Sequence, residues 1–452
     1  MSAEWGYKRR VTQRSSSVDT TTKRRLDVIK MAVRVAVVGA GPAGLCAARH
    51  TQAAGMCCTV FELSGDVGGT WQYTDCVGTD AYGIPIHTSM YRDLRINVPK
   101  DVVMFPGIPH KNTEDSYLTS EEILEYLHNY ADMFNLRALC KFNHYVKRIS
   151  RKEGEWLVTV IDLPNNEEGT YKFDALFICN GLNNKPMMAY IKGAESFVGS
   201  SMHSHDYRKP EPFAGQRVLI VGGGASALDL TNHISKFADK VFLSHRSDRF
   251  KVENLSLANN VVYKPEAQEL FTHSVVFQDG TIEDIDAIVY CTGYKCNYSF
   301  MDGSCGITED DGLVYPLYKH FVNANQNSMC ILGNMCHSMQ FPTFDIQVRF
   351  FLKSLTTGFL PKKEDMLQDI KKHAEKKLVD GKPKKLYFIT TAEEDADYYG
   401  NLAALANIDP LPRVLTKIHA RAVSQIYDNF PLFRGDKYKV IDNETFVVSP
   451  PA

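Results

Sequence analysis

A glycine-rich turn between two apolar segments constrains the fold of this chain more than any other feature. Residues 33–64, VRVAVVGAGPAGLCAARHTQAAGMCCTVFELS, place Gly39, Gly41 and Gly44 after a β-branched strand and at the start of an Ala-rich helix. A second strand ends at Glu62. The first glycine permits a tight turn, the second lets backbone approach a pyrophosphate, and the third lets helix and strand pack closely. Because the helix N-terminus also attracts anions, this segment predicts a dinucleotide-binding βαβ unit.

The same pattern occurs again in residues 216–246, QRVLIVGGGASALDLTNHISKFADKVFLSHR. Gly222 and Gly224 form the turn, and the following strand ends at Ser244, with Arg246 two residues later. An acid at this place favours a free ribose diol, whereas an arginine and a hydroxyl suit a 2′-phosphate. We therefore expect FAD at the first unit and NADPH at the second. The alternative for Arg246 is a solvated surface cation.

Two further segments resemble each other and complete the two units. FDALFICNG (173–181) and IDAIVYCTG (285–293) are each an apolar strand before a glycine, and each follows a hairpin-like stretch. Each βαβ unit therefore has its own returning strand. We predict an α/β fold with two Rossmann-like dinucleotide-binding domains. The NADPH domain (194–319) is inserted into a discontinuous FAD domain (32–193 and 320–452).

Composition narrows the classes of function. The 452 residues suffice for two large domains, and the net charge of −2 lacks the basic footprint of a nucleic-acid-binding protein. No apolar run reaches the length of a membrane span. Eleven irregularly spaced cysteines favour a reduced compartment, so we expect a cytoplasmic protein and regard a homodimer as possible. Residues 1–31 are predicted to be a disordered basic extension.

Two redox cofactors in one chain raise the question of the final electron acceptor. Flavin disulfide reductases carry a cysteine pair after the first unit, but DVGGTWQYTDC (66–76) offers Cys76 alone. The other acceptor is O₂, whose activation on flavin requires apolar walls and few polar groups. SMYRDLRINVPKDVVMFPGIPH (89–110) fits such a wall, and its amide Asn97 could hold a peroxide without protonating it. The alternative is that the Asn97 side chain only makes a structural hydrogen bond to the backbone, just before Val98.

The segment FVGSSMHSHDY (197–207) lies where the chain would cross from the first domain to the second. His203 and His205 have the spacing of metal ligands on an extended segment, but no further ligand cluster accompanies them. We therefore expect no metal site. We interpret His203 and Tyr207 as residues of the junction, which couple the placement of the domains to the bound nucleotide.

Taken together, these segments resemble the class B flavin-containing monooxygenases. GAGPAG, FELSGDVGGTW, SMYRDLRINVPKDVVMFPGIP, FVGSSMHSHDY, VGGGASALD and CTGY follow in the order of that family, over roughly residues 33–427. Phe197, Gly199, His203 and Tyr207 supply the signature F-x-G-x-x-x-H with its later aromatic residue. Related Baeyer–Villiger enzymes carry Trp in that last place. The chain is similar to the insect and yeast members of the N- and S-oxidising branch, some of which are alkaloid N-oxygenases.

The resemblance implies a reaction. NADPH would reduce FAD, and O₂ would then form a C4a-hydroperoxyflavin that bound NADP⁺ shields. The nitrogen or sulfur of a small amine or sulfide, such as a xenobiotic or an alkaloid, would attack the distal oxygen. The alternatives are a Baeyer–Villiger monooxygenase and a flavin- and NADP-binding redox sensor that has lost oxygenation.

The resemblance also assigns site residues by position. Asn97 matches the family's amide beside flavin and nicotinamide and is the candidate catalytic residue. Val146 would offer backbone to the adenine, and Gln347 would approach the isoalloxazine. The implied FAD contacts are Gly39, Ala40, Gly41, Pro42, Ala43, Gly44, Glu62, Gly69, Thr70, Trp71, Ile96, Asn97, Val98, Val146 and Gln347, and the implied NADP contacts are Gly222, Gly224, Ser226, Ala227, Asp229, Ser244 and Arg246. The chain departs from the family pattern at Ile96, where a Thr is usual.

Overall fold

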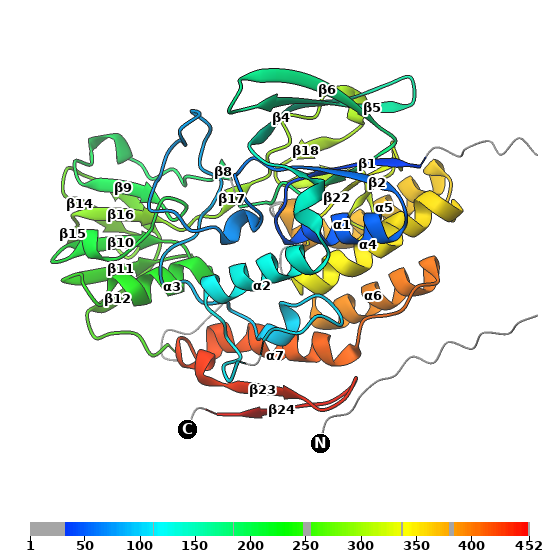
Figure 1. Cartoon of the computed structure of the whole chain (residues 1–452). Coiled ribbons are helices and arrows are strands. Elements are labelled where there is room, and N and C mark those ends of the chain that lie inside the picture. The colour runs from blue at the N-terminus through cyan, green and yellow to red at the C-terminus, as the bar shows by residue number, and fades with distance from the viewer. Residues whose placement is uncertain are drawn as a thin grey trace, which may run out of the picture. The chain divides into compact units, whose positions relative to one another are not determined.

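The first dinucleotide-binding unit is built on a seven-stranded sheet in the order β20–β21–β22–β7–β1–β2–β3 (Figure 1). A computed structural model describes residues 32–111, 113–183, 185–246, 255–335, 338–378 and 384–450. The predicted basic extension, 1–31, lies outside these ranges. The strands are β1 (Arg34–Val38), β2 (Cys57–Phe61), β3 (Cys140–Lys141), β7 (Ala175–Ile178), β20 (Leu317–Tyr318), β21 (Val322–Asn323) and β22 (Met329–Ile331). β1 pairs in parallel with both β2 and β7.

The two faces of this sheet pack against different partners because successive strand residues point to opposite sides. Val35 and Val37 pack with helix α1 (Pro42–Ala53) and helix α4 (Gln340–Thr357). Ala36 and Val38 pack instead against an antiparallel sheet. That sheet consists of β4 (His144–Lys152), β5 (Glu155–Asp162) and β6 (Glu167–Phe173), and it connects β3 to β7.

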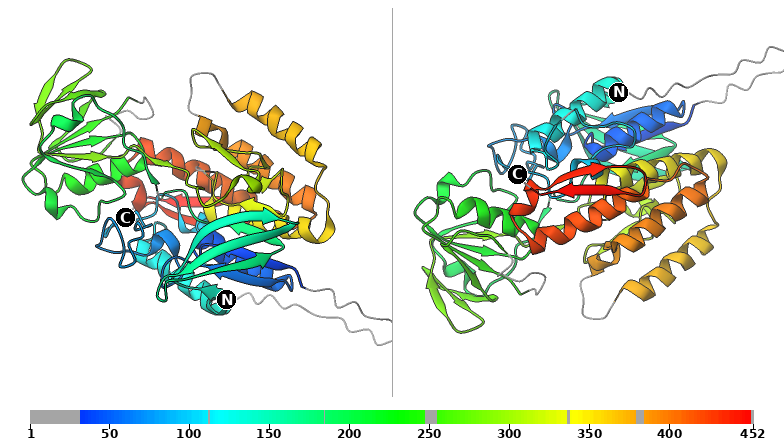
Figure 2. Two further views of the ribbon diagram at one scale, coloured as in Figure 1. Left: turned by 90° about the horizontal axis from the view of Figure 1, so that it is seen from above. Right: turned by 90° about the horizontal axis from the view of Figure 1, so that it is seen from below.

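The second unit repeats this plan on a five-stranded parallel sheet in the order β12–β11–β10–β16–β9. Its elements are β9 (Ser200–His203), β10 (Arg217–Val221), α3 (Ala225–Ile234), β11 (Lys240–Ser244), β12 (Val261–Lys264) and β16 (Ala287–Tyr290). Val218 and Ile220 pack toward α3, while Leu219 packs against the antiparallel sheet of β13 (Ala267–Leu270), β14 (Ser274–Phe277) and β15 (Ile282–Asp284). In both views of Figure 2 the green elements of this unit form a group of their own. The predicted returning strands are β7 and β16, so the α/β fold with two Rossmann-like units is confirmed.

The chain crosses between the units at two neighbouring segments. β8 (Lys185–Pro186), on the way out, pairs with β17 (Tyr294–Lys295), on the way back. After β17, a buried core shared with β1 includes Tyr298, Cys305 and Val314. This packing favours a return of the chain to the first unit before the predicted boundary after residue 319. The domain limits therefore stay a proposal.

The remaining elements cover the first unit. They are α2 (Ser120–Met133), β18 (Thr308–Asp310), β19 (Leu313–Tyr315), α5 (Lys363–Lys377), α6 (Ala392–Ala406), α7 (Arg413–Asp428), β23 (Lys437–Val440) and β24 (Phe446–Ser449). Helices α4, α6 and α7 pack on one another in sequence order. Across the described ranges, none of the helices combines the length and the apolar character that a bilayer span requires.

Two helical glycines with opposite surroundings test how tightly α1 packs on the turn before it. A Cβ on Gly44 would lie 1.8 Å from the carbonyl oxygen of Gly39, whereas a Cβ on Gly400 in α6 would meet no described heavy atom within 4 Å. We expect Gly44→Ala to destabilise the fold by about 1–3 kcal/mol or more, because backbone has to move. Gly400→Ala should stabilise it by about 0.5–1 kcal/mol through helix propensity. Thermal unfolding of both variants measures the difference, and equal shifts would contradict the close packing.

Candidate functional site

The first glycine-rich turn leaves a helix end open to an anion. Gly39 has a φ of +101°, and a Cβ there would lie 2.6 Å from the carbonyl oxygen of Cys179 at the end of β7. Gly41 is the N-cap of α1, which begins with Pro42 and Ala43 and has no acid in its first turn. Among the residues that the structure describes, no side chain caps this end. Its N–H groups and dipole are therefore available to a phosphate.

Glu62 is fixed at the end of β2 beside this turn. Its buried carboxylate accepts hydrogen bonds from the backbone N–H of Ala40 at 2.6 Å and from the N–H and hydroxyl of Ser64, each at 2.8 Å. Burial raises the pKa of Glu62, and the hydrogen bonds from Ser64 and Ala40 oppose that shift. The carbonyl oxygen of Glu62 accepts from His144 at the start of β4, so Val146, two residues further on, lies close by.

The GTW turn packs directly on the first glycine turn. The N–H of Gly68 donates to the carbonyl oxygen of Ala40 at 3.0 Å, and a Cβ on Gly69 would come within 2.9 Å of the Gly41 Cα. Thr70 and Trp71 follow in the same short 3₁₀ turn, and both are partly buried. The structure thus brings together the predicted FAD contacts around Gly39, Glu62 and Gly69.

The second glycine turn repeats the geometry of the first. A Cβ on Gly222, whose φ is +138°, would lie 2.3 Å from the carbonyl oxygen of Cys291 at the end of β16. Gly224 is the N-cap of α3, and within the described chain this helix end also has no side-chain cap and no acid in its first turn. Ser226 is exposed there, while Ala227 is fully buried and can offer only backbone.

The two residues predicted to bind the 2′-phosphate have different surroundings. Ser244 is 1% exposed, donates to the carbonyl oxygen of Pro265 at 2.7 Å and accepts from the N–H of Ala267 at 3.0 Å. Its hydroxyl proton is already engaged, so Ser244 ties β11 to β13 and is not a phosphate donor in this structure. Arg246 has 82% of its side chain exposed, 3.7 Å from a carboxylate oxygen of Glu266. Of these two residues, only Arg246 therefore stays a proposed contact of the 2′-phosphate.

Asp229, another predicted NADP contact, is instead buried in a network with Arg434. One carboxylate oxygen accepts from Arg434 Nη1 at 2.7 Å and the other from the Tyr91 hydroxyl. Arg434 Nη2 donates to Asn97 Oδ1 at 2.6 Å and to the Arg95 carbonyl at 3.3 Å. We now interpret Asp229 as a link between the units. The amide oxygen of Asn97 accepts a hydrogen bond from the Arg434 side chain. The structural alternative had assumed a bond to the neighbouring backbone.

Asn97 and Gln347 belong to two separate segments of the first unit, and neighbouring residues hold both segments in place. Ile96 is 5% exposed, and its N–H donates to the Leu118 carbonyl at 2.9 Å, while Val98 is partly buried in the same core. In α4, Gln347 Nε2 donates to the Tyr398 hydroxyl at 2.8 Å. Gln347 Oε1 is buried without a hydrogen-bond partner among the described residues, so it can accept from a bound ring N–H.

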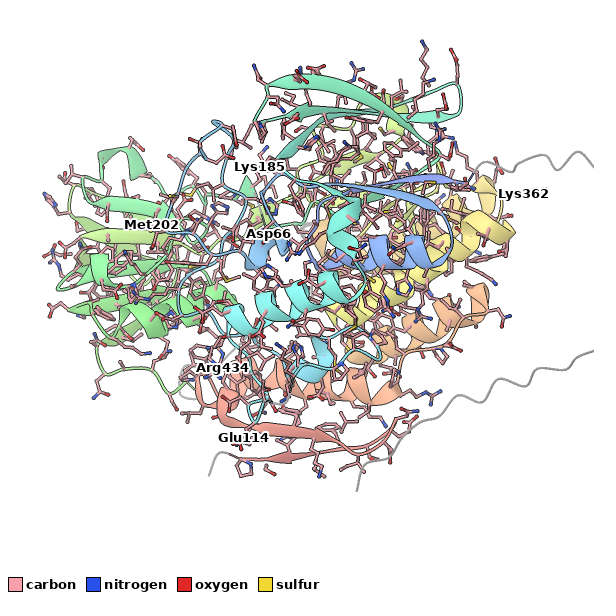
Figure 3. The ribbon with its side chains drawn as sticks, viewed as in Figure 1. Asp66, Glu114, Lys185, Met202, Lys362 and Arg434 are labelled. Carbon is pink, nitrogen blue, oxygen red and sulfur yellow. The ribbon has the colours of Figure 1, made fainter. Side chains whose placement is uncertain are left out.

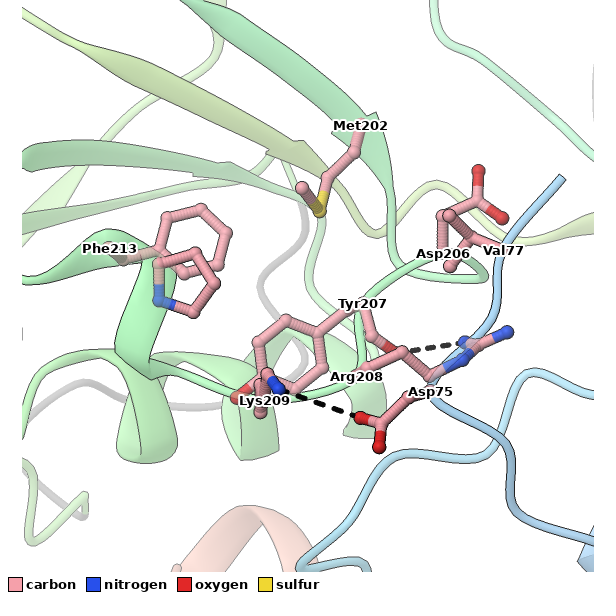
Figure 4. A pocket seen from close by; sticks show the side chains of 9 residues that line it. Asp75, Val77, Met202, Asp206, Tyr207, Arg208, Lys209 and Phe213 are labelled. Atoms are coloured by element: carbon pink, nitrogen blue, oxygen red, sulfur yellow. Dashed lines mark hydrogen bonds and ion pairs between the residues drawn. The ribbon is translucent and has the colours of Figure 1, made fainter.

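The signature segment joins the second sheet to the loop after the GTW turn. His203, His205 and Tyr207 are buried, and the His205 N–H donates to Nδ1 of His203 at 3.1 Å. The Arg208 guanidinium donates to the carbonyl oxygens of Cys76, Thr88, His205 and Tyr207 at 2.7–3.3 Å. Figure 4 shows the small cavity beside it, about 210 Å³, lined by Met202, Tyr207, Lys209 and Asp75 among others.

Comparisons with known proteins decide the family. A family model described as flavin-binding monooxygenase-like matches residues 32–257 and 251–418. The chain belongs to this family. It is 30% identical to a senecionine N-oxygenase of Tyria jacobaeae over 420 residues, which cover 92% of this chain and 91% of that protein. It is 32% identical to the flavin-containing monooxygenase FMO GS-OX-like 3 of Arabidopsis thaliana over 397 residues, 82% of this chain and 86% of that protein.

Solved structures agree with this membership. An S-allyl-L-cysteine S-oxygenase from Allium sativum superposes with a TM-score of 0.83 at 28% identity, covering 90% of this chain and 95% of that one. Tmm from a Pelagibacter strain gives a TM-score of 0.80 at 26% identity, with 92% and 96% covered. The predicted resemblance is therefore confirmed. This protein is a flavin monooxygenase, and its cofactors are FAD and NADPH.

The residues of this monooxygenase fit both cofactors. Each dinucleotide needs an anion-binding helix end, and Gly41 and Gly224 open two uncapped ones. A free adenosine ribose suits the carboxylate of Glu62, and a 2′-phosphate suits the exposed cation Arg246. The assignment of individual residues to each cofactor remains a proposal. Asp229 and Ser244 no longer belong to it, because their side chains bond other residues of the chain.

Sequence reasoning missed Arg434, which lies in the FPLFRGD segment near the end of the chain. Figure 3 shows it after α7, and its bond to Asn97 spans 337 residues of sequence. A lone arginine after a helix carries no pattern that distinguishes it from a surface cation. Only the tertiary fold brings it to Asp229 and Asn97.

The role of Arg246 can be tested by comparing two dinucleotides. We expect Arg246→Ala to weaken NADPH binding about tenfold or more, because a charge-assisted hydrogen bond to phosphate is lost, and to leave NADH binding unchanged. Arg413→Ala is a matched control, since that side chain is 79% exposed and 3.9 Å from Glu444. Dissociation constants of the oxidised, FAD-loaded variants give the answer. Equal weakening of NADPH and NADH by Arg246→Ala would rule out the phosphate contact.

Proposed function

We propose that this flavin monooxygenase oxygenates the nucleophilic nitrogen or sulfur of small amines and sulfides, such as alkaloids or xenobiotics. The observation that carries the proposal is the position of Asn97, a neutral amide of the first unit that is joined through Arg434 to Asp229 of the second. A neutral donor at this junction suits an oxidant that must not be protonated early. The similarity to a named N-oxygenase and a named S-oxygenase supports the choice of acceptor atom.

The segment that contains Asn97 is largely apolar and buried, as such chemistry requires. Ile96, Val102 and Phe105 are each 5% exposed or less, and Phe105 stacks on Phe341 of α4 at 4.9 Å between ring centroids. When bound, NADPH supplies the hydride and FAD the activation of O₂. In this proposal the buried apolar residues of the segment keep water away from the reacting oxygen, which suppresses the release of peroxide.

Tyr91 is an ionisable side chain of the same segment that contacts the second unit. Its ring packs edge-on against Tyr207 at 5.5 Å between centroids, and its hydroxyl donates to Asp229. Burial, with the adjacent carboxylate of Asp229, raises the pKa of Tyr91 far above its usual value. The phenol therefore keeps its proton at neutral pH and serves as a fixed hydrogen-bond donor. A cytoplasmic location and a homodimer remain predictions beside this proposal.

Product analysis tests the proposed activity directly. With NADPH, O₂ and a tertiary amine or a dialkyl sulfide, we expect one oxygenated product for nearly every NADPH consumed. A cyclic ketone should give little product, because Tyr207 replaces the tryptophan of the related Baeyer–Villiger enzymes. Mass spectrometry measures the oxygenated product, and a peroxide assay measures the O₂ that is released as H₂O₂. Lactone as the main product would favour the Baeyer–Villiger alternative, and H₂O₂ alone would favour a redox sensor.

Asn97→Ser tests the amide itself. We expect the variant to retain FAD and to lose tenfold or more of its oxygenated product, with H₂O₂ formed instead, because one well-placed donor is removed. Asn325→Ser is the control, since that partly buried amide bonds the Gly306 carbonyl at 2.9 Å, away from Asn97. It should change stability without changing the ratio of product to peroxide. An unchanged ratio in Asn97→Ser would exclude the proposed role.

A further inference from the structure

Arg434 is a buried cation that joins three distant segments of the chain. It lies in the short turn Leu432–Gly435 after α7, with 11% of its side chain exposed. Nη1 donates to Asp229 Oδ1 at 2.7 Å, and Nη2 donates to Asn97 Oδ1 at 2.6 Å. One side chain thus touches α3 of the second unit and the apolar wall of the first.

Two aromatic rings and a buried carboxylate hold the guanidinium in place. The rings of Phe430 and Phe433 lie 5.8 and 5.3 Å from its central carbon, and Asp229, which is 2% exposed, accepts a second bond from Tyr91. A guanidinium is a planar fork, so its two terminal nitrogens cannot be aimed independently. The direction toward Asp229 therefore also sets the direction toward Asn97.

This arrangement decides which end of the Asn97 amide is available. The amide oxygen accepts from a cation, and such charge-assisted hydrogen bonds are about twice as strong as neutral ones. Turning the amide over would place its NH₂ group against the guanidinium, where donor faces donor. Asn97 can therefore present only its NH₂ group to a cofactor or an oxygen species.

The anchor of Arg434 is part of the second nucleotide-binding helix. Asp229 follows Gly224, the N-cap of α3, by five residues, so the carboxylate is one turn away from the end that faces the nucleotide. A displacement of α3 when NADP⁺ binds or leaves would move Asp229 and, through the rigid fork, Asn97. The occupancy of the second unit would then alter the amide in the first.

We propose that Arg434 is a positioning residue that makes Asn97 a hydrogen-bond donor and links it to α3. The inference rests on the proposed function, since it assumes that the amide of Asn97 serves the oxygenation and lies beside the bound NADP⁺. Arg434 itself acts through Asn97 and need not touch substrate or cofactor.

A double-mutant cycle on the FAD-loaded protein tests this proposal. The variants are Arg434→Met, Arg434→Lys, Asn97→Ser and Arg434→Met combined with Asn97→Ser. Lysine keeps a cation against Asp229, so it protects folding, but a single ammonium cannot reproduce the fork. Arg349→Met is the matched control: Arg349 Nε bonds the buried Asp345 at 2.6 Å, and Nη1 bonds the Asp409 carbonyl at 2.8 Å, without contact to Asn97. Each variant is measured for its melting temperature, its NADP⁺ dissociation constant in the oxidised state and its share of H₂O₂.

We expect Arg434→Met and Arg434→Lys each to raise the NADP⁺ dissociation constant and the ratio of peroxide to product about tenfold, the effect of one lost charge-assisted bond. In the Asn97→Ser background, Arg434→Met should change neither quantity further. Arg349→Met should lower the melting temperature and leave both quantities unchanged.

Additive effects of the two substitutions, or wild-type values in Arg434→Lys, would overturn the proposal. Its failure is separable from that of the proposed function. If the unsubstituted enzyme released only H₂O₂, the proposed oxygenation would be wrong, and the NADP⁺ cycle would still decide whether Arg434 acts through Asn97.

Discussion

The close approach of a glycine to the end of a returning strand is the contact on which both nucleotide-binding units depend. Gly39 meets the carbonyl of Cys179, and Gly222 meets that of Cys291, at distances that any side chain would obstruct. In each unit this contact lays the glycine-rich turn over the sheet and directs the next helix with its N-terminus outward. The uncapped N–H groups then lie where a pyrophosphate can reach them. The same backbone contact therefore shapes both cofactor sites.

Two arginines hold the units together by different means. Arg208 donates to four carbonyl oxygens of the crossing segment and the loop after the GTW turn, so it fixes backbone. Arg434 bonds two side chains, Asp229 and Asn97, so it fixes functional groups. Removing a guanidinium from water carries a desolvation penalty of several kcal/mol, which hydrogen bonds to acceptors offset. Arg434 offsets it through its two terminal nitrogens, while its Nε has no hydrogen-bond partner among the described residues. The relative placement of the units is therefore specified at both contacts and not left to apolar packing alone.

Local sequence patterns predicted the features of the fold that depend on residues close together in the chain. The two βαβ units, the returning strands and the inserted second unit follow from glycine spacing and apolar periodicity, and the structure has all of them. The partners of single side chains depend on distant contacts and were not predicted. Ser244, expected to hold a 2′-phosphate, bonds Pro265 and Ala267, and Asp229, expected at the NADP site, bonds Arg434. A sequence pattern places a side chain on an element, whereas its partner is set by elements that arrive later in the chain.

Under the proposed function, the apolar segment and the charged network around Asn97 serve one physical requirement. A site that stores an oxidant must exclude water, yet its hydrogen-bond donor must be held in one orientation, and apolar side chains cannot orient an amide. In that role, the charges of Arg434 and Asp229 lie beside Asn97, where they satisfy each other at 2.7 Å. Because the pair is nearly neutral as a whole, it orients the amide without bringing a free charge or an exchangeable acid to the reacting side. The polarity of the amide is thus set by residues from the second unit and the chain end, which explains why three distant segments meet at this one side chain.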